Sequence, residues 1–351
     1  MQKAVEFKNV TKAYGEVTAV RDINFSIDPG KLVTLLGPSG CGKTTTLRLI
    51  AGLEMVTDGN IFIGGKEVTH ISASDRDVSM VFQSYALFPH MTVIQNVSYG
   101  LTMSHMTKTE VAEKAQQGLD LVGLADFGGR LPSELSGGQQ QRVAVARALV
   151  LEPEVLLFDE PLSNLDAKLR RRVREEIREL QQKLSLTTVY VTHDQEEALA
   201  VSDLIIVMND AIISQEGTPR QLYEEPENIF VSDFIGDANL IKAEILNIVR
   251  DKAEVNIGGI HLKLKHNGIP KGEVNVAVRP QAINLNSSTN KNNIPATILK
   301  ASYLGDHLEY TLSSTIGELF VIDNQMEKLF KSGTQVYLTF RNHGLSLVPE
   351  S

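Results

Sequence analysis

Two stretches of the sequence have the residue types of loops that hold phosphate groups. The first, GPSGCGKT at residues 37–44, fits the pattern G-x-x-x-x-G-K-[ST] and lies between an expected buried strand, KLVTLLG, and the expected helical run TTLRLIAGL. Glycines let backbone N–H groups wrap around phosphates, the lysine reaches the β- and γ-phosphates, and the threonine hydroxyl completes a Mg²⁺ shell. We predict a nucleotide site here, with no catalytic role for the thiol; its residues are Gly37, Pro38, Ser39, Gly40, Cys41, Gly42, Lys43, Thr44 and Thr45.

The second stretch, ELSGGQQQR at residues 134–142, comes directly before the apolar run VAVARALV. Ser136 can cap a helix N-terminus, and Gly137 and Gly138 let a ligand approach backbone N–H groups closely. The composition predicts a second anion-binding helix N-terminus, in a chain that already has a complete phosphate-binding loop.

An acidic strand end, VLLFDE at residues 155–160, completes the candidate chemistry. Asp159 at the end of a buried strand is placed to hold Mg²⁺ through water. Glu160 is a second carboxylate beside the metal, placed to polarise an attacking water as general base. An ordinary pair of charges at a strand end is the alternative for these two residues.

The elements that must position these residues alternate between strands and helices over residues 1–237. VEFKNVTKAY, VLLFDEP, TTVYVTHD and LIIVMN read as strands, and TTLRLIAGL and NLDAKLRRRVREEIRELQQKL read as helices. Apolar residues at helical intervals from Val111 to Val122 predict a separate helical insert, placed at about residues 84–150. This alternation predicts an α/β fold with a parallel sheet.

The texture changes near residues 234–240. From there on, short alternating strands such as GEVNVAVRP, HLEYTLSS and QVYLTF are separated by Gly, Asn, Pro and Ser. We predict that residues 238–351 form a small all-β, barrel-like domain of the OB type.

Composition and charge limit the function classes. Residues 238–351 carry 12 Lys/Arg against 10 Asp/Glu, a net of +2, and residues 1–237 carry 22 against 33, a net of −11. Neither part has the basic footprint of a nucleic-acid binder, so we expect no nucleic-acid partner. A single cysteine fits a reducing compartment. We expect no signal peptide and no membrane span, because the N-terminus lacks an apolar h-region and no run approaches about 20 apolar residues.

The motifs occur in the order of an ATP-binding-cassette (ABC) ATPase, which residues 4–237 resemble. The resemblance rests on Tyr14, GPSGCGKTT, Gln83, LSGGQ, VLLFDEP, SNLD and His193. It implies that Tyr14 stacks on adenine, that Gln83 contacts Mg²⁺ and the attacking water, and that His193 hydrogen-bonds the γ-phosphate. Taken singly, Tyr14 and His193 would read as ordinary residues at strand ends.

The resemblance also explains the second anion site. In this family two cassettes pack head to tail, and each ATP lies between the phosphate-binding loop of one subunit and the LSGGQ loop of the other. Ser136, Gly137, Gly138 and Gln139 would therefore serve the ATP of a second copy of the chain. Asn164 and Asp166 would lie in the loop that links the two active sites.

Three function classes compete. A DNA-repair ATPase would need long heptads between the two loops, and a translation ATPase would carry two cassettes; neither is present in the sequence. The transporter class is favoured by an apolar cluster after Gln83. By resemblance this cluster forms the groove for a helix of the membrane subunit; its members are Tyr85, Leu87, Phe88, Pro89 and Met91.

The C-terminal part resembles the regulatory (TOBE-type) domain of importer ATPases, through GDANL, VRPQAI and YLGDHLEY. The resemblance implies a dimeric ATPase at the cytoplasmic face of the inner membrane. It would use ATP and Mg²⁺ and work with two permease subunits and a periplasmic or extracellular solute-binding protein. The cassette looks closest to the ferric-iron importer ATPases. Ferric iron is the first expectation for cargo, with polyamine, sugar, sugar phosphate or phosphonate as alternatives.

Overall fold

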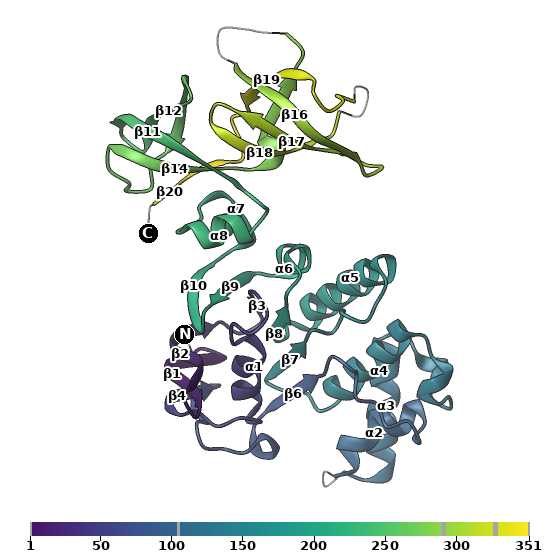
Figure 1. Ribbon diagram of the computed structural model, residues 1–351. Helices are drawn as coiled ribbons and strands as arrows, with labels where there is room; N and C mark the ends of the chain where they lie inside the picture. The colour runs from purple at the N-terminus through teal and green to yellow at the C-terminus, as the bar shows by residue number, and fades with distance from the viewer. Residues whose placement is uncertain (1, 104–105, 289–292, 326–328, 350–351) are drawn as a thin grey trace. The chain divides into compact units, whose positions relative to one another are not determined.

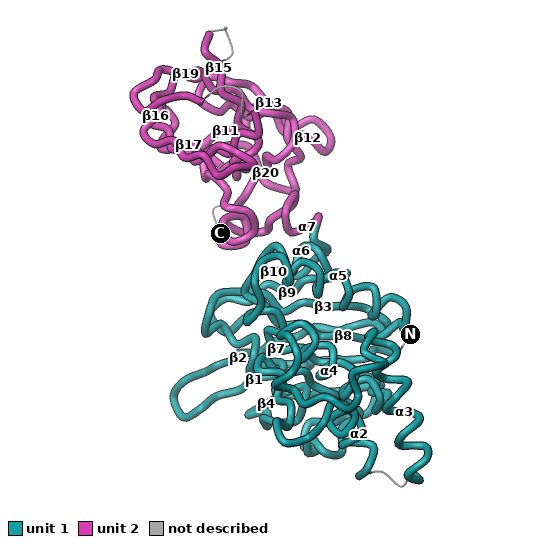
Figure 2. The backbone as a smooth tube through the Cα atoms, turned by 90° about the vertical axis from the view of Figure 1, so that its right-hand side faces the viewer, with its two compact units in different colours: residues 1–219 teal, residues 220–351 magenta. Residues whose placement is uncertain are grey.

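A computed structural model describes residues 2–103, 106–288, 293–325 and 329–349 (Figure 1). The chain divides into two compact units, Met1–Pro219 and Arg220–Ser351, which Figure 2 colours separately. Each unit is described by itself below.

Unit 1 is built on two sheets. The first is antiparallel with strand order β2-β1-β4-β5, formed by β1 (Val5–Tyr14), β2 (Val17–Ile27), β4 (Asp58–Ile63) and β5 (Lys66–Glu67). The second has the order β10-β9-β3-β8-β7-β6, formed by β3 (Leu32–Leu36), β6 (Val78–Val81), β7 (Val155–Asp159), β8 (Thr187–Thr192), β9 (Leu204–Asn209) and β10 (Ile212–Gly217). All neighbours in the second sheet are parallel except β9 and β10. The predicted parallel α/β sheet is therefore confirmed.

Helices cover both faces of the parallel sheet. Helix α1 (Lys43–Ala51) contacts β2 on one side and β6, β7 and β8 on the other, so it lies between the two sheets (Figure 1). Helices α5 (Ala167–Leu184) and α6 (Gln195–Val201) contact each other, and α6 also contacts β3 and β8. Because alternate strand residues point to opposite faces, Leu157 joins the cluster around α1, whereas Leu156 and Phe158 join the cluster that includes α5.

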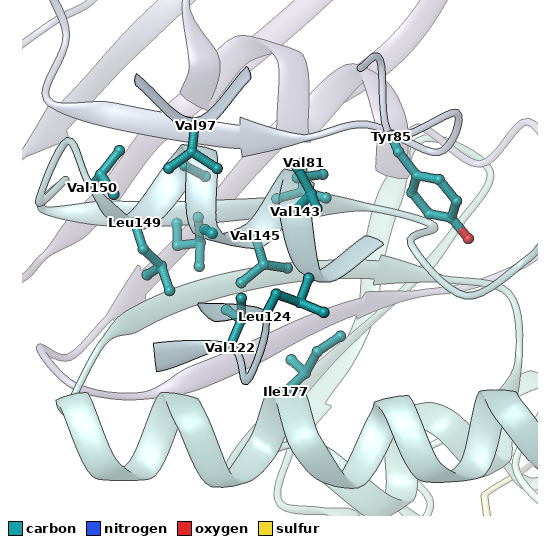
Figure 3. Packing of buried hydrophobic residues seen from close by; sticks show 14 of the residues in the cluster. Val81, Tyr85, Val97, Val122, Leu124, Val143, Val145, Leu149, Val150 and Ile177 are labelled. Atoms are coloured by element: carbon teal, nitrogen blue, oxygen red, sulfur yellow. The ribbon is translucent and has the colours of Figure 1, made fainter. Parts of the chain in front are cut away.

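Three helices follow β6 and form a group of their own (Figure 1): α2 (Val93–Thr102), α3 (Lys108–Leu121) and α4 (Gly137–Leu149). Each begins at a capping box in which a Ser or Thr side chain and a Gln or Glu three residues later satisfy the free N–H groups. Short 3₁₀ turns lie at η1 (Ala73–Asp75), η2 (Ala125–Phe127) and η3 (Pro132–Glu134). Figure 3 shows the apolar packing of this group, with Val143, Val145 and Val150 from the segment around α4 beside Val97 and Val122.

Unit 2 contains two five-stranded antiparallel sheets, which confirms the predicted all-β domain. One has the order β13-β12-β11-β14-β20, formed by β11 (Asn239–Val249), β12 (Lys252–Ile257), β13 (Ile260–Lys265), β14 (Gly272–Val278) and β20 (Leu345–Val348). The other has the order β15-β19-β16-β17-β18, formed by β15 (Ile283–Asn286), β16 (Ile294–Tyr303), β17 (Leu308–Ser314), β18 (Gly317–Asp323) and β19 (Gln335–Phe340). One apolar cluster joins them. The unit also has α7 (Pro219–Glu224), α8 (Ile229–Phe234) and the 3₁₀ turn η4 (Pro280–Ala282).

The division between the compact units falls between residues 219 and 220, whereas the sequence predicts a domain boundary between residues 237 and 238. A buried arginine of unit 2 explains why the division comes earlier in the chain. Arg279 is 1% exposed and donates to the carbonyl oxygens of Tyr223 (2.7 Å) and Ser232 (2.6 Å), and its guanidinium lies 4.3 Å from the centre of the Tyr223 ring. These contacts attach α7 and α8 to the β strands, although both helices precede the change in sequence texture.

Candidate nucleotide-hydrolysis site

The phosphate-binding loop connects β3 to α1, as the sequence predicts. Gly42 has φ +105°, and a Cβ there would lie 2.5 Å from the carbonyl oxygen of Ala19, so only glycine fits. Lys43 is buried, and its ammonium donates to the carbonyl oxygens of Gly37 (2.7 Å) and Pro38 (2.8 Å). The loop thus folds around its own lysine, while Ser39 is exposed at the tip. An anion held by the loop would compete with these carbonyls for the ammonium.

The predicted metal-binding residues meet between α1 and β7. The Thr44 hydroxyl donates to the Asp159 carboxylate at 3.4 Å. Burial raises the pKa of Asp159, with a smaller contribution from Glu160, while the nearby charge of Arg48 lowers it. A hydroxyl and a carboxylate at this distance form an all-oxygen donor pair, which is the kind that Mg²⁺ prefers.

Glu160 and His193 come together from the ends of two neighbouring strands. Glu160 directly follows β7, His193 follows β8, and the His193 Nδ1 lies 3.2 Å from Glu160 Oε1. Glu160 has φ +44°, an uncommon conformation for a residue with a side chain, and its N–H donates to the carbonyl of Val191 at 3.1 Å. A strained backbone conformation persists only where surrounding contacts hold it in place, and such residues are often found at functional sites.

Gln83 is tied to the loop that follows Glu160. Its amide nitrogen donates to the Ser163 hydroxyl (3.2 Å), which in turn donates to the carbonyl of Glu160 (3.0 Å). Asn164 donates back to the carbonyl of Gln83 at 3.0 Å. The structure therefore connects Gln83, Glu160 and Asn164, three residues that the sequence places up to 81 positions apart.

A buried ion network that the sequence interpretation missed supports the His193 loop. The Glu197 carboxylate is 5% exposed and accepts from the hydroxyls of Thr192 (2.8 Å) and Tyr190 (3.2 Å). Arg170 of α5 lies 3.8 Å from Glu197 and 3.4 Å from Asp194. Thr192 and Asp194 flank His193, so the network holds that loop against α5. The only signal in the sequence is the acidic run HDQEE, which resembles an ordinary first helical turn.

The aromatic residue expected at adenine lies close to the start of α1. Tyr14 ends β1 with 46% of its surface exposed, and the Lys12 ammonium lies 4.5 Å from the centre of its ring. Burial and then a hydrogen bond with Glu54 raise the pKa of its hydroxyl, while Thr45 and Lys12 act in the opposite direction. The exposed ring therefore lies within reach of the phosphate-binding loop.

The signature loop begins α4 and rests on α5. Ser136 accepts from Gln139 N–H at 3.4 Å, and Gln139 Oε1 accepts from Ser136 N–H at 2.9 Å. A Cβ at Gly138 would lie 3.1 Å from Leu169, so the glycine allows α4 to approach the first turn of α5 closely. That turn starts at Asp166, which accepts from Leu169 N–H at 3.0 Å. The signature loop and the Asn164–Asp166 loop are therefore adjacent, but neither reaches the phosphate-binding loop through any hydrogen bond among the described residues.

The apolar residues after Gln83 divide into buried and exposed members. Tyr85 is 5% exposed and packs into the core of the insert, and Leu87 is half-buried against the same core. Pro89 is exposed, and Phe88 and Met91 are half-buried. Arg147 fixes the turn by donating to the carbonyls of Tyr85 (2.8 Å) and Ala86 (2.7 Å). Figure 3 shows the Tyr85 ring at the edge of this packing.

Comparisons with known proteins decide the family. The family model described as ABC transporter matches residues 20–163, and the model described as TOBE domain matches residues 276–348. A protein of Rhizobium etli named Fe(3+) ions import ATP-binding protein is 56% identical over 344 residues, which covers 98% of this chain and 97% of the relative. A protein of the same name from Agrobacterium fabrum is 55% identical and covers 98% of each chain. This chain belongs to the ABC transporter family.

A solved structure agrees with the geometry of this ABC ATPase. The dimeric post-hydrolysis state of an ATP-binding cassette bound to ADP and Pi is 33% identical, with a TM-score of 0.55. It covers 62% of this chain and 99% of that chain. The fold, the ATP binding and the ATP hydrolysis predicted from the motifs are thereby confirmed. None of the helices in the described part of the chain combines the length and the apolar composition that a membrane-spanning helix needs.

Proposed function

We propose that this ABC ATPase powers the uptake of ferric iron. It acts as a head-to-tail homodimer on two permease subunits at the cytoplasmic face of the membrane, and a solute-binding protein delivers cargo to the permease. The observation that carries the proposal is the match to proteins named for ferric-ion import, at 55–56% identity over nearly the whole chain, β unit included.

ATP enters the proposal through the loop before α1. The phosphates replace the carbonyls of Gly37 and Pro38 as partners of the Lys43 ammonium, because an anion is the stronger acceptor. Exposed loop N–H groups and the N-terminus of α1 add further positive charge toward the phosphates. The ring of Tyr14 stacks on adenine, and its 46% exposure leaves a face free for that contact.

The residues fit Mg²⁺ as the accompanying ion. Thr44 and Asp159 supply oxygen ligands that already lie 3.4 Å apart, and Gln83, whose amide nitrogen donates to Ser163, would add its amide oxygen. Bound there, Mg²⁺ neutralises phosphate charge. Burial destabilises the charged form of Asp159 and so raises its pKa, and a divalent ion bound beside it would stabilise the carboxylate.

Glu160 is the proposed general base. One carboxylate oxygen accepts the proton of the attacking water, while His193, 3.2 Å from that carboxylate, hydrogen-bonds the γ-phosphate and fixes the angle of approach. Two hydrogen bonds connect Gln83 to Glu160: Gln83 donates to the Ser163 hydroxyl, which donates to the carbonyl of Glu160. Movement of Gln83 would therefore alter the position of the base.

The second subunit completes each site in this proposal. Ser136, Gly137, Gly138 and Gln139 face the ATP of the other copy, and a dimeric cassette of 33% identity supports the arrangement. Asn164 and Asp166 couple the two sites. Asn164 donates a hydrogen bond to Gln83 of one site, and Asp166 begins the helix against which the signature loop packs.

Phe88, Pro89 and Met91 are the proposed permease contacts. Tyr85 is buried, and the half-buried Leu87 packs against the same core, so both support that surface from below. Asn96 shapes it by accepting from Phe88 N–H (2.8 Å) and donating to the carbonyls of Phe88 and Met91 (both 3.1 Å). The surface lies in the same segment as Gln83, so a permease helix bound here would act on the catalytic residues over a short path.

Uptake of radiolabelled ferric iron in a strain that lacks this chain tests the proposal. Wild-type protein and the control Glu113→Gln, an exposed position in the helical insert, should restore uptake, whereas Glu160→Gln should not. If the deletion strain takes up ferric iron normally but has lost uptake of polyamine, sugar, sugar phosphate or phosphonate, that solute is the cargo and the proposed importer ATPase role stands. Normal uptake of every one of these solutes would refute the importer proposal.

A further inference from the structure

A half-buried cation of α4 contacts the segment that carries Gln83. Arg147 lies in the last turn of α4, the helix that begins at Ser136. Its guanidinium donates from two nitrogens to two successive carbonyls, those of Tyr85 (2.8 Å) and Ala86 (2.7 Å). Burial lowers the pKa of Arg147, and no acidic side chain among the described residues offsets that effect. The desolvation of this cation is therefore compensated by contacts with the backbone of one turn.

The turn that Arg147 contacts has an uncommon backbone conformation. Tyr85 (φ +61°) and Ala86 (φ +47°) both lie in the left-handed region. Where two such residues follow each other, glycine, asparagine and aspartate are the usual choices, because they tolerate positive φ. Tyrosine and alanine do not, so surrounding contacts must hold this conformation in place. A guanidinium is suited to that task, since its donors form a rigid planar fork that reaches two carbonyls at once.

Gln83 lies inside the same turn. The N–H of Tyr85 donates to the carbonyl of Phe82 at 2.9 Å, so Gln83 and Ser84 are the two residues between the ends of that hydrogen bond. Because Gln83 is exposed, packing in the core does not fix it. Its position depends on its own hydrogen bonds and on the geometry of the turn, one end of which is held by Arg147.

The same cation also contacts the apolar surface that follows the turn. The central carbon of the Arg147 guanidinium lies 5.7 Å from the centre of the Phe88 ring, within the range of a cation–π contact. Phe88 in turn packs against Tyr99 of α2, with 4.7 Å between the ring centres. One side chain of α4 therefore contacts both ends of the segment between Gln83 and Phe88.

We propose that Arg147 is a positioning residue for ATP hydrolysis and acts through Gln83. By binding the two carbonyls it holds the turn in the conformation that keeps the Gln83 amide in reach of the Ser163 hydroxyl, which donates to the carbonyl of Glu160. The inference rests on the catalytic role proposed above for Gln83. It also gives α4 a second task, because the helix connects the signature loop at its start with the turn of Gln83 near its end.

ATP turnover by the full-length protein tests the inference in a double-mutant cycle. Arg147→Met removes both donors and keeps an unbranched stem, and Gln83→Ala removes the amide that Arg147 is proposed to position. We expect each change to lower kcat by about tenfold or more, with a KM for ATP within about twofold of wild type because the phosphate-binding loop is intact. If Arg147 acts through Gln83, the double variant should be at most about twofold slower than Gln83→Ala, whereas independent effects would multiply.

Arg171→Met is the matched control. Arg171 lies on α5 with 77% of its side chain exposed, and its loss should leave kcat and KM close to wild type. Thermal unfolding shows whether each variant is folded. If Arg147→Met has no cooperative transition, Arg147→Lys takes its place in the cycle. Lysine keeps the charge but not the fork of two nitrogens, so it should give a smaller loss of kcat that is again absent in the Gln83→Ala background.

The results separate this inference from the proposal on which it rests. If Gln83→Ala is slow while Arg147→Met has the kcat of wild type, or if the two losses multiply, Arg147 does not act through Gln83 and the role of Gln83 stands. If Gln83→Ala has the kcat of wild type, the proposed role of Gln83 is wrong, and the inference on Arg147 is wrong with it.

Discussion

Replacement of Glu197 by alanine should destabilise unit 1 and slow ATP hydrolysis together. The substitution strands the hydroxyls of Tyr190, which is 1% exposed, and Thr192, which is 3% exposed, and it removes the ion pair with Arg170. Each stranded buried group costs about 1–3 kcal/mol. Relief from burying the carboxylate offsets part of this, so we expect a net loss of about 2–4 kcal/mol. For a unit of this size, that corresponds to a fall in Tm of roughly 4–16 °C.

Turnover supplies the functional measurement. Because Thr192 and Asp194 flank His193, relaxation of the network should displace the His193 ring, and a 1 Å misplacement can cost about 10² in rate. We expect kcat to fall by about tenfold or more, with little change in KM for ATP. Glu196→Ala, the exposed neighbour on the same helix, is the matched control and should leave both Tm and kcat close to wild type. Equal behaviour of the two variants would refute the reasoning.

The pH dependence of stability provides a further check on Glu197. Burial raises its pKa above the ordinary value of 4.5, so folding makes the carboxyl easier to protonate than it is in the unfolded chain. The stability that this contributes is complete below about pH 4.5 and is lost as the pH rises through the higher folded-state pKa. Wild type should therefore lose stability relative to Glu197→Gln over that range. A difference between the two that does not vary with pH would contradict a buried, raised-pKa carboxyl.

Two further substitutions test other parts of the molecule. Glu160→Gln should retain ATP binding in calorimetry and lower turnover by about 10² or more, whereas near-normal turnover would remove Glu160 from the role of base. Arg279→Met should destabilise unit 2 by about 2–4 kcal/mol, because two charge-assisted hydrogen bonds to the carbonyls of Tyr223 and Ser232 are lost. It should expose α7 and α8 to limited proteolysis, and the exposed control Arg341→Met should not; equal cleavage of both variants would show that Arg279 does not hold these helices.

Much of the site could be predicted because its chemistry depends on local sequence. The loop before α1 needs glycine at position 42 directly followed by lysine at 43. The acidic pair must come at the end of a buried strand. Both features can be recognised in a short stretch of sequence. The capping box at Ser136 is local in the same way, since both its partners lie within one helical turn.

The parts that could not be predicted depend on distant contacts. Arg170 and Glu197 are 27 positions apart and meet only because α5 and α6 pack together, so no spacing rule signals their pairing. Cys41 lies in the phosphate-binding loop, yet its thiol is buried in the core around α1 and burial raises its pKa. Arg279 holds α7 and α8, which precede the β strands, and the change to short alternating strands in the sequence does not predict such a contact.

Disulfide trapping across two copies of the chain tests the composite ATP site most directly. The buried Cys41 is a poor probe, but Ser39 and Ser136 are both exposed and lie in the two loops that the account brings together. Protein carrying Ser39→Cys is mixed with protein carrying Ser136→Cys, both in a Glu160→Gln background, and oxidised with and without ATP and magnesium. We expect an ATP-dependent band of dimer mass that dithiothreitol reverses, since a disulfide forms when the two Cα atoms lie within about 4.4–6.8 Å. No such band in the mixture, together with an internal bridge at monomer mass when one chain carries both cysteines, would contradict the head-to-tail site.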